Sequence, residues 1–371
     1  MNVPLLDLVA QYQSIKESVL PAMMSVIERQ SFIMGPEVAQ LEAAVAKVCE
    51  APYGIACASG TDALLLPLKA LGLKPGDEVI APSFTFFATA GAIHNAGGKP
   101  VFVEIDADSF NVSPDAIAAA VTPRTRAIVV VHLFGQMAAM EKILPIARKH
   151  GLTVIEDGAQ AIGARRKIDG TWRVACGLGD VGTLSFFPSK NLGAWGDGGM
   201  MITGDEAGAA RLKRLRLHGG AKEYHHDEVG TNSRLDTLQA AILLAKLPYL
   251  AGWSAARRAR AARYNLAFQG HAAIRAPVTD ADNEHIFHQY TLRVPNRDGL
   301  SGHLKSKGIG SKVYYPIALH LQHCFADLGY RKGSLPVTER AMDEVISLPI
   351  YPELTDAQQD TVIDAVKGFY S

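Results

Sequence analysis

The chain has 371 residues, of which 48% are hydrophobic, and this allows a large buried core. Lys plus Arg and Asp plus Glu both number 37, so the formal net charge is zero. This balance lacks the basic excess that is typical of nucleic-acid-binding proteins. No apolar run reaches the ~18 residues of a membrane span, and the first residues lack the pattern of a signal peptide. We therefore expect a cytoplasmic protein that binds neither nucleic acid nor membranes.

Short apolar runs rich in β-forming residues alternate with segments of helical period from about residue 40 to 205. This alternation predicts an α/β domain whose mostly parallel sheet has helices on both faces. Several of the runs end in polar residues, and ligands of open α/β sheets bind at the carboxyl ends of the strands. We therefore expect one site there. The predicted strands are residues 53–58, 78–81, 99–104, 127–132, 153–156, 182–187 and 199–203.

The pattern changes after a predicted helix at residues 233–247, which ends at Pro248 because proline has no backbone N–H. From about Trp253 there follow a long helix, a mixed segment and two further strand–helix units. We predict a large domain at residues 1–250 and a small C-terminal domain at residues 251–371. The N-terminal segment is a candidate to pack with the small domain.

Lys190 stands out for its position, just after an apolar strand in the run Ser-Phe-Phe-Pro-Ser-Lys-Asn-Leu-Gly. A desolvated lysine stays partly neutral and can form a Schiff base. Asp157 ends another strand, where an anion would keep a pyridine nitrogen protonated. Gln160, one helical turn on, could reach a phenolic oxygen of the same ring. Taken singly, a lysine such as Lys190 is more often an ordinary loop lysine, and Asp157 is equally well a helix cap.

A phosphate-binding turn is predicted at Ser59-Gly60-Thr61, between a strand and a helix. Backbone amides at a helix N-terminus suit an anion, and Ser185 offers a hydroxyl to the same phosphate. Phe86 could stack on the cofactor ring, although an isolated phenylalanine is more often a core residue. The four cysteines are scattered and show no zinc-type or disulfide-type spacing, so we expect no metal site.

Together these motifs resemble the DegT/DnrJ/EryC1/StrS family of sugar aminotransferases, which has the type I, aspartate-aminotransferase-like fold with a seven-stranded sheet in its large domain. The resemblance implies pyridoxal 5'-phosphate (PLP) as cofactor and Lys190 as its Schiff-base lysine and proton shuttle. It implies that Asp157 binds the pyridine nitrogen, Gln160 the phenolic oxygen and Phe86 the ring face. Gly60, Thr61 and Ser185 would then hold the phosphate. The matching segments are residues 59–64, 82–89, 156–163, 185–199, 230–242 and 315–322.

Two further residues match the family, and the first of them implies a homodimer with shared active sites. Asn232 matches a family asparagine that reaches the phosphate of the neighbouring subunit's cofactor. Arg234 matches the arginine of the family's Asn-x-Arg motif, and its guanidinium suits the carboxylate of the amino donor, L-glutamate.

Residues 218–230 and 232–247 resemble the subgroup that aminates UDP-linked 3-keto uronic acids for surface polysaccharides such as O-antigen. Tyr314 stands where that subgroup tends to have histidine, and residues 165–177 carry an insertion. Amination of a dTDP-linked keto-6-deoxyhexose is therefore an alternative. We expect the nucleotide-sugar substrate to contact Tyr314, Tyr315 and His320, and the His-rich runs 224–226 and 285–290 are further candidates. Ordinary packing or a surface role is an equally good interpretation of each.

Three other functions fit the sequence less well. A sugar dehydratase on this scaffold would have histidine in place of Lys190. A non-catalytic regulatory protein would be expected to have lost Lys190 or Asp157, and both are present. A nicotinamide-dependent oxidoreductase would need Gly-x-Gly-x-x-Gly between a strand and a helix, and no strand here is followed by it.

Overall fold

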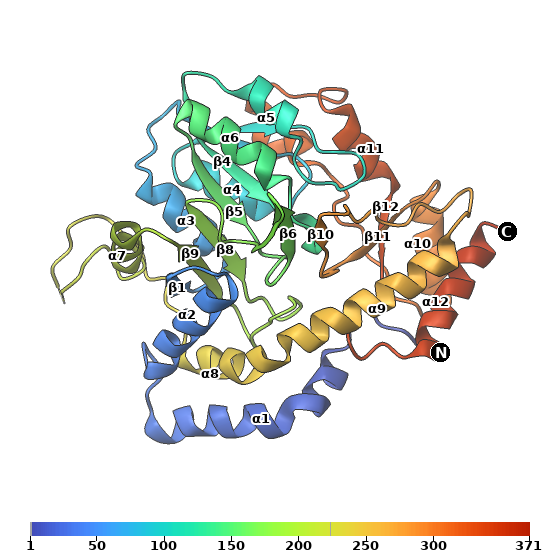
Figure 1. Cartoon of the computed structure of the whole chain (residues 1–371), viewed down its shortest axis with the longest axis horizontal. Coiled ribbons are helices and arrows are strands. Elements are labelled where there is room, and N and C mark those ends of the chain that lie inside the picture. The colour runs from blue at the N-terminus through green and yellow to red at the C-terminus, as the bar shows by residue number, and fades with distance from the viewer. Residues whose placement is uncertain (1, 223) are drawn as a thin grey trace.

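A seven-stranded sheet forms the centre of the computed structural model, which describes residues 2–222 and 224–371 (Figure 1). Its strand order is β1-β9-β8-β5-β4-β2-β3. Only β9 runs against its neighbours, β1 and β8, so the prediction of a mostly parallel sheet is confirmed. The strands are β1 Tyr53–Cys57, β2 Glu78–Pro82, β3 Lys99–Val103, β4 Thr125–Val131, β5 Thr153–Asp157, β8 Val181–Ser185 and β9 Gly199–Thr203.

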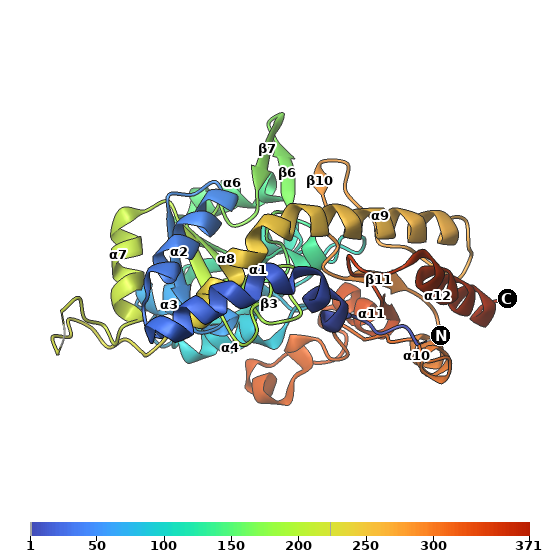
Figure 2. The same cartoon turned by 90° about the horizontal axis from the view of Figure 1, so that it is seen from below.

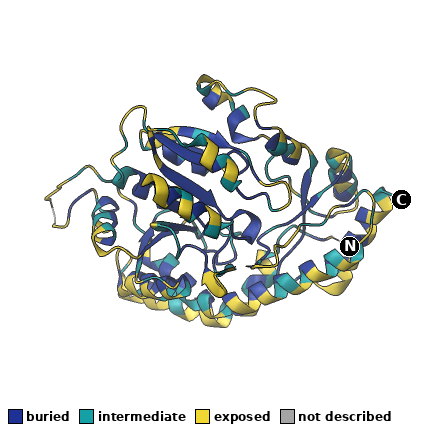
Figure 3. Cartoon of the chain, turned by 45° about the horizontal axis from the view of Figure 1, so that its top comes forward, coloured by how far each residue is buried: buried dark blue, intermediate teal, exposed yellow. Residues whose placement is uncertain are grey.

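Helices cover both faces of this sheet. Successive residues of a strand point to opposite faces, and β4 shows the consequence: Ile128 and Val130 pack into one core cluster, whereas Ala127 and Val129 pack into another. Figure 3 shows the strands buried and the outer faces of the helices exposed. The helices of this part are α2 Pro36–Val48, α3 Gly60–Ala70, α4 Phe87–Asn95, α5 Pro114–Ala120, α6 Met140–His150, α7 Glu206–Leu215 and α8 Thr237–Lys246.

A separate core cluster lies in the C-terminal part, around the antiparallel pair β11–β12. Val3 belongs to this cluster, and its amide donates to Gly308 O at 3.0 Å, so the N-terminal segment packs here. The helix α1 Leu8–Arg29 then lies along α8 (Figure 1). The remaining elements are α9 Leu250–Phe268, β10 Asn283–Glu284, β11 Tyr290–Arg293, α10 Arg297–Ser306, α11 Pro336–Glu344, β12 Val345–Leu348, α12 Asp356–Phe369 and the short turns η1 Leu133–Gly135, η2 Leu247–Tyr249, η3 Leu319–Leu321 and η4 His323–Leu328.

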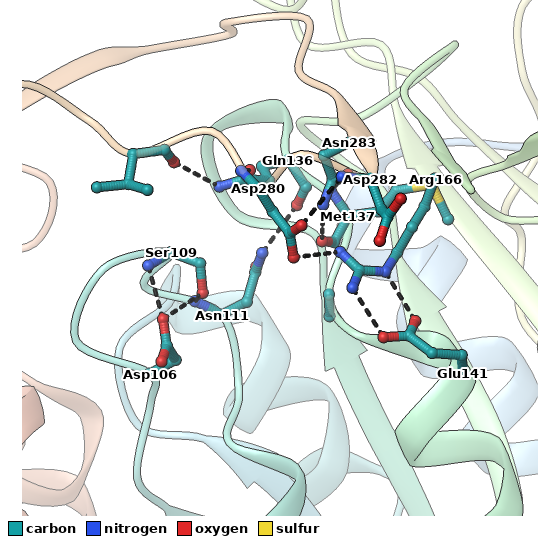
Figure 4. A network of polar contacts seen from close by, with 12 residues as sticks. Asp106, Ser109, Asn111, Gln136, Met137, Glu141, Arg166, Asp280, Asp282 and Asn283 are labelled. Carbon is teal, nitrogen blue, oxygen red and sulfur yellow. Dashed lines mark hydrogen bonds and ion pairs between the residues drawn. The ribbon is translucent and has the colours of Figure 1, made fainter. Parts of the chain in front are cut away.

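The predicted insertion forms a hairpin of β6 Arg165–Ile168 and β7 Thr171–Val174, which projects from the body of the molecule (Figure 2). β10 extends this hairpin to three strands. At its base, Arg166 donates twice to Glu141, each time at 2.7 Å, and once to Asp280 at 2.9 Å (Figure 4). The amide of Asp280 in turn donates to Gln136 Oε1 at 2.8 Å. The network therefore fixes the segment before β10 against the loop that follows β4.

Candidate active site

A cavity of about 390 Å³ opens at the carboxyl ends of β1, β2, β4, β5 and β8. Because these strands all point the same way, the polar residues that end them meet at one edge of the sheet, as expected. The structure brings nine predicted site residues to its wall: Gly60, Thr61, Phe86, Asp157, Gln160, Ser185, Lys190, Tyr314 and Tyr315.

Lys190 lies in the loop after β8, where its backbone amide donates to Phe187 O at 2.8 Å. Burial lowers the pKa of the Lys190 amine to about 8, because desolvation disfavours the charged form, and the nearby Asp157 carboxylate only partly opposes this. A substantial fraction of the amine is therefore neutral near pH 8. A neutral amine is the form that attacks a carbonyl carbon.

Asp157 is the last residue of β5 and is only 5% exposed. Its carboxyl accepts hydrogen bonds from the Thr89 hydroxyl at 3.0 Å and from the Ala159 amide at 3.2 Å. Burial nevertheless raises the pKa of Asp157 above its usual range. A cation placed beside this carboxyl would pair with it strongly, because water cannot solvate either charge there.

Glu156 precedes Asp157 and faces the other side of the sheet, where it accepts from three backbone amides, those of residues 176, 178 and 179. His132 Nε2 also donates to it, at 2.8 Å. His132 Nδ1 accepts from the Ala138 amide, and this fixes the proton on Nε2. Although burial alone would raise it, these donors hold the pKa of Glu156 below its usual range. Glu156 therefore holds the end of β5 in place from the opposite face of the sheet.

The turn from β1 to α3 forms a cradle opposite Ser185. Ser59 caps the helix, since its hydroxyl accepts from the Asp62 amide at 3.1 Å. A Cβ atom at Gly60 would lie 2.6 Å from Ser185 Cβ and 2.8 Å from its Oγ. Only glycine leaves this space open, and the amides of a helix N-terminus line it.

Gln160 is held in a defined orientation. Its Oε1 accepts from the Phe134 amide at 2.7 Å, and its Nε2 donates to the Tyr315 hydroxyl at 3.0 Å. An amide nitrogen has two hydrogens, so Gln160 can also donate to a ligand oxygen in the cavity. The Phe86 ring is 57% exposed and lies 6.3 Å from the Tyr315 ring.

The structure does not bring His320 to this wall. His320 is 2% exposed, and its ring bonds to Ser83 Oγ at 2.7 Å and to Glu339 Oε1 at 3.1 Å. The turn η3 directs the side chain into this buried contact. A substrate contact of His320 therefore has no support in the geometry.

Asn232 and Arg234 line a neighbouring pocket of about 340 Å³ rather than the cavity itself. Asp197 lines both spaces. Within one chain the two residues are therefore next to the cavity but not in it, and Asn232 is exposed.

The sequence did not indicate a role for Thr89, and it predicted His288 only as a member of a run of candidate substrate contacts. Thr89 lies in a segment that matches the family, but its contact with Asp157 spans 68 residues. His288 is a cavity residue from the predicted His-rich run.

Residues 13–367 match the model of the DegT/DnrJ/EryC1/StrS aminotransferase family. The chain belongs to this family. Its predicted fold class, aminotransferase activity and PLP cofactor are thereby confirmed. The crystal structure of S. venezuelae DesV matches with a TM-score of 0.95 and 41% identity, covering 99% of this chain and 98% of that one.

Curated relatives match along nearly the whole chain. The pleiotropic regulatory protein of Geobacillus stearothermophilus is 49% identical, covering 100% of this chain and 99% of its own. The UDP-N-acetyl-3-dehydro-alpha-D-glucosamine 3-aminotransferase of Acidithiobacillus ferrooxidans is 45% identical, covering 96% and 95%. The UDP-2-acetamido-2-deoxy-3-oxo-D-glucuronate aminotransferase of Pseudomonas aeruginosa is 43% identical, covering 96% and 97%.

The residues present fit PLP. The cradle at Gly60 suits a phosphate, the buried Asp157 suits a pyridine nitrogen, and Lys190 suits an aldehyde carbon. When bound, PLP supplies the electron sink that stabilises a carbanion beside an amino group.

Proposed function

We propose that this enzyme transfers the amino group of L-glutamate to a UDP-linked 3-keto sugar, of the uronic acid type, for the synthesis of a surface polysaccharide such as O-antigen. The observation that carries the proposal is the pairing of a partly neutral Lys190 with the buried Asp157 in one cavity. The names of two relatives, which act on UDP-linked 3-keto sugars, support the substrate class. The retained Lys190 and Asp157 favour catalysis over a purely regulatory role.

In this proposal Lys190 Nζ would hold the cofactor through its aldehyde carbon, and after its release by the amino donor the free amine would take up the proton of the donor's α-carbon. The negative charge of Asp157 would keep the pyridine nitrogen protonated. Gln160 would donate to the phenolic oxygen, Phe86 would cover the ring, and the Gly60–Thr61 turn with Ser185 would bind the phosphate. Tyr314 and Tyr315 would contact the sugar.

We further propose a cytoplasmic homodimer in which each cavity is completed by its neighbour. Asn232 would reach the other subunit's phosphate, and the Arg234 guanidinium would bind the carboxylate of L-glutamate. Ile33 lines the same pocket as Asn232 and Arg234 and is 51% exposed, and this exposed apolar side chain supports an interface. Among the described helices, none is long and apolar enough to cross a bilayer.

The test is the visible absorption spectrum of the purified protein with PLP. L-glutamate should convert the absorption band of the cofactor bound to Lys190 into that of the aminated cofactor. UDP-linked 3-keto sugars should then restore it, and a comparison of the uronic acid, its N-acetylglucosamine counterpart and a dTDP-linked keto-6-deoxyhexose identifies the substrate. Lys190→Ala is the control, which should not form the first band. If the wild-type protein takes up no PLP, the proposal is wrong.

A further inference from the structure

The segment before β11 contains two buried histidines, His285 and His288, which are 4% and 5% exposed. They differ in position, since His288 lines the active-site cavity and His285 does not. His285 instead stacks on Phe287 with ring centroids 3.9 Å apart.

His288 is linked to the residue that follows Lys190. Its Nδ1 lies 2.9 Å from Asn191 Oδ1, and both side chains are buried. A carboxamide oxygen only accepts hydrogen bonds, so Nδ1 carries the proton of the ring and Nε2 is left as an acceptor. Gln289 Nε2 lies 3.4 Å from that second nitrogen. The tautomer of His288 is therefore defined by its neighbours.

Arg257 of α9 holds the backbone around His288 in place. Its Nη1 donates to the carbonyl oxygens of Phe287, His288 and Ile350, at 3.3, 3.4 and 2.7 Å. Burial lowers the pKa of His288 well below its usual range, and the positive charges of Lys190 and Arg257 act in the same direction. The ring is therefore neutral at physiological pH.

The loop between β8 and β9 carries Lys190, and we call it the lysine loop. A second contact joins this loop to another element. Lys246 of α8 donates to the carbonyl oxygen of Gly193. The loop is therefore held at two nearby residues. Asn191 contacts the segment before β11, and Gly193 contacts α8.

We propose that His288 is a positioning residue for Lys190: through Asn191 it holds the lysine loop against the cavity wall and keeps water from the amine. The proposal rests on the proposed role of Lys190 as the lysine that holds PLP. The charged groups that face the pair are Asp157, next to Lys190, and Arg257, next to His288. Asp197 also lines the cavity.

This role has a measurable consequence for the Lys190 amine, whose pKa burial lowers to about 8. Loss of the anchor would let the loop move and admit water. The pKa of the amine should then rise towards its usual value near ~10.4. An increase of about one unit lowers the neutral fraction at pH 7 about tenfold.

The test measures how fast an amine-specific reagent modifies Lys190 in the full chain without cofactor, as a function of pH, with the modified peptide quantified by mass spectrometry. His288→Leu removes the donor and should slow modification at pH 7 about tenfold. His288→Asn keeps an N–H near the position of Nδ1 and should stay within about threefold of the wild type. His285→Leu is the matched control, since it empties an equally buried histidine site on the same segment and should leave the Lys190 profile unchanged.

Asn191→Ala breaks the same contact from the other side, so it provides a second measurement if His288→Leu does not fold. An unchanged midpoint of the Lys190 profile in a folded His288→Leu or Asn191→Ala protein would overturn the proposal. An equal shift in His285→Leu would also overturn it, because the effect would then be general loosening. Since the measurement needs no PLP, failure of the proposed function would be seen separately, as absence of PLP uptake by the wild type.

Discussion

The two sides of the active-site cavity differ in how their polar groups are held. One side of the cavity is formed around the end of β5, and we call it the sheet side. There, Asp157 bonds to Thr89 and Ala159, and Gln160 bonds to Phe134 and Tyr315. We call the side that adjoins the neighbouring pocket, which Asn232 and Arg234 line, the open side. Phe86 and Phe187, which line the cavity itself, are more than half exposed, at 57% and 52%.

This difference separates two tasks. Groups that stabilise charge during a reaction work best when they are already oriented, because no reorganisation is then needed. The sheet side has this property within a single chain. The open side instead has the features of a surface that binds a substrate or a second subunit.

The largest effect is expected on the sheet side, from Asp157→Asn. The amide can still bond to Thr89 but has no negative charge, so the pyridine nitrogen loses its proton and the electron sink is weakened. We expect kcat to fall by about 10²–10³-fold, which is typical of losing one preorganised electrostatic group. Asp197→Asn removes a carboxylate from the same cavity and should cost much less. Equal losses in both variants would mean that the position of Asp157 is not special.

The open side is tested by mixing two inactive variants, Lys190→Ala and Arg234→Ala, after denaturation and refolding together. If the sites are shared, a mixed dimer has one site with both residues intact. Random pairing makes half of the dimers mixed, so about one site in four should be active. The activity of the mixture against each variant alone is the measurement. No recovery, with dimers confirmed by their mass, would show that each site uses residues of one chain only.

The sheet side was also the more predictable from sequence. Strand period and strand-end polar residues sufficed to place Asp157, Lys190 and the Gly60 turn at one edge, because parallel strands share their carboxyl ends. His320 was placed wrongly with respect to the cavity, since its partner Ser83 is 237 residues away in the chain. The contact between His288 and Asn191 spans 97 residues and left no local pattern. The division at residue 250 stays a prediction.

A smaller effect is expected from Gly60→Ala, which fills the cradle opposite Ser185. The new Cβ would come within 2.6 Å of Ser185 Cβ, so the turn or the serine must move. We expect PLP to bind about tenfold more weakly, a loss of roughly 1.4 kcal/mol. Fluorescence titration of the cofactor-free protein with PLP measures this. Inorganic phosphate should compete with PLP in the wild type and less well in the variant, and unchanged binding of both would place the phosphate elsewhere.

The last prediction concerns stability rather than activity, and it rests on the buried His285. Burial lowers the pKa of His285 to about 3, so the folded state keeps it neutral where the unfolded state, with a pKa near ~6.5, takes up a proton. As the pH falls below ~6.5, this residue should therefore lower the free energy of unfolding by about 1.4 kcal/mol per pH unit. The decrease should continue until the pH reaches the pKa of His285 in the folded state. Between pH 7 and pH 5, the free energy of unfolding measured with denaturant should fall by about 2 kcal/mol less in His285→Leu than in the wild type. Parallel pH dependences for the two proteins would mean that His285 takes up a proton in the folded state, and that water reaches its ring.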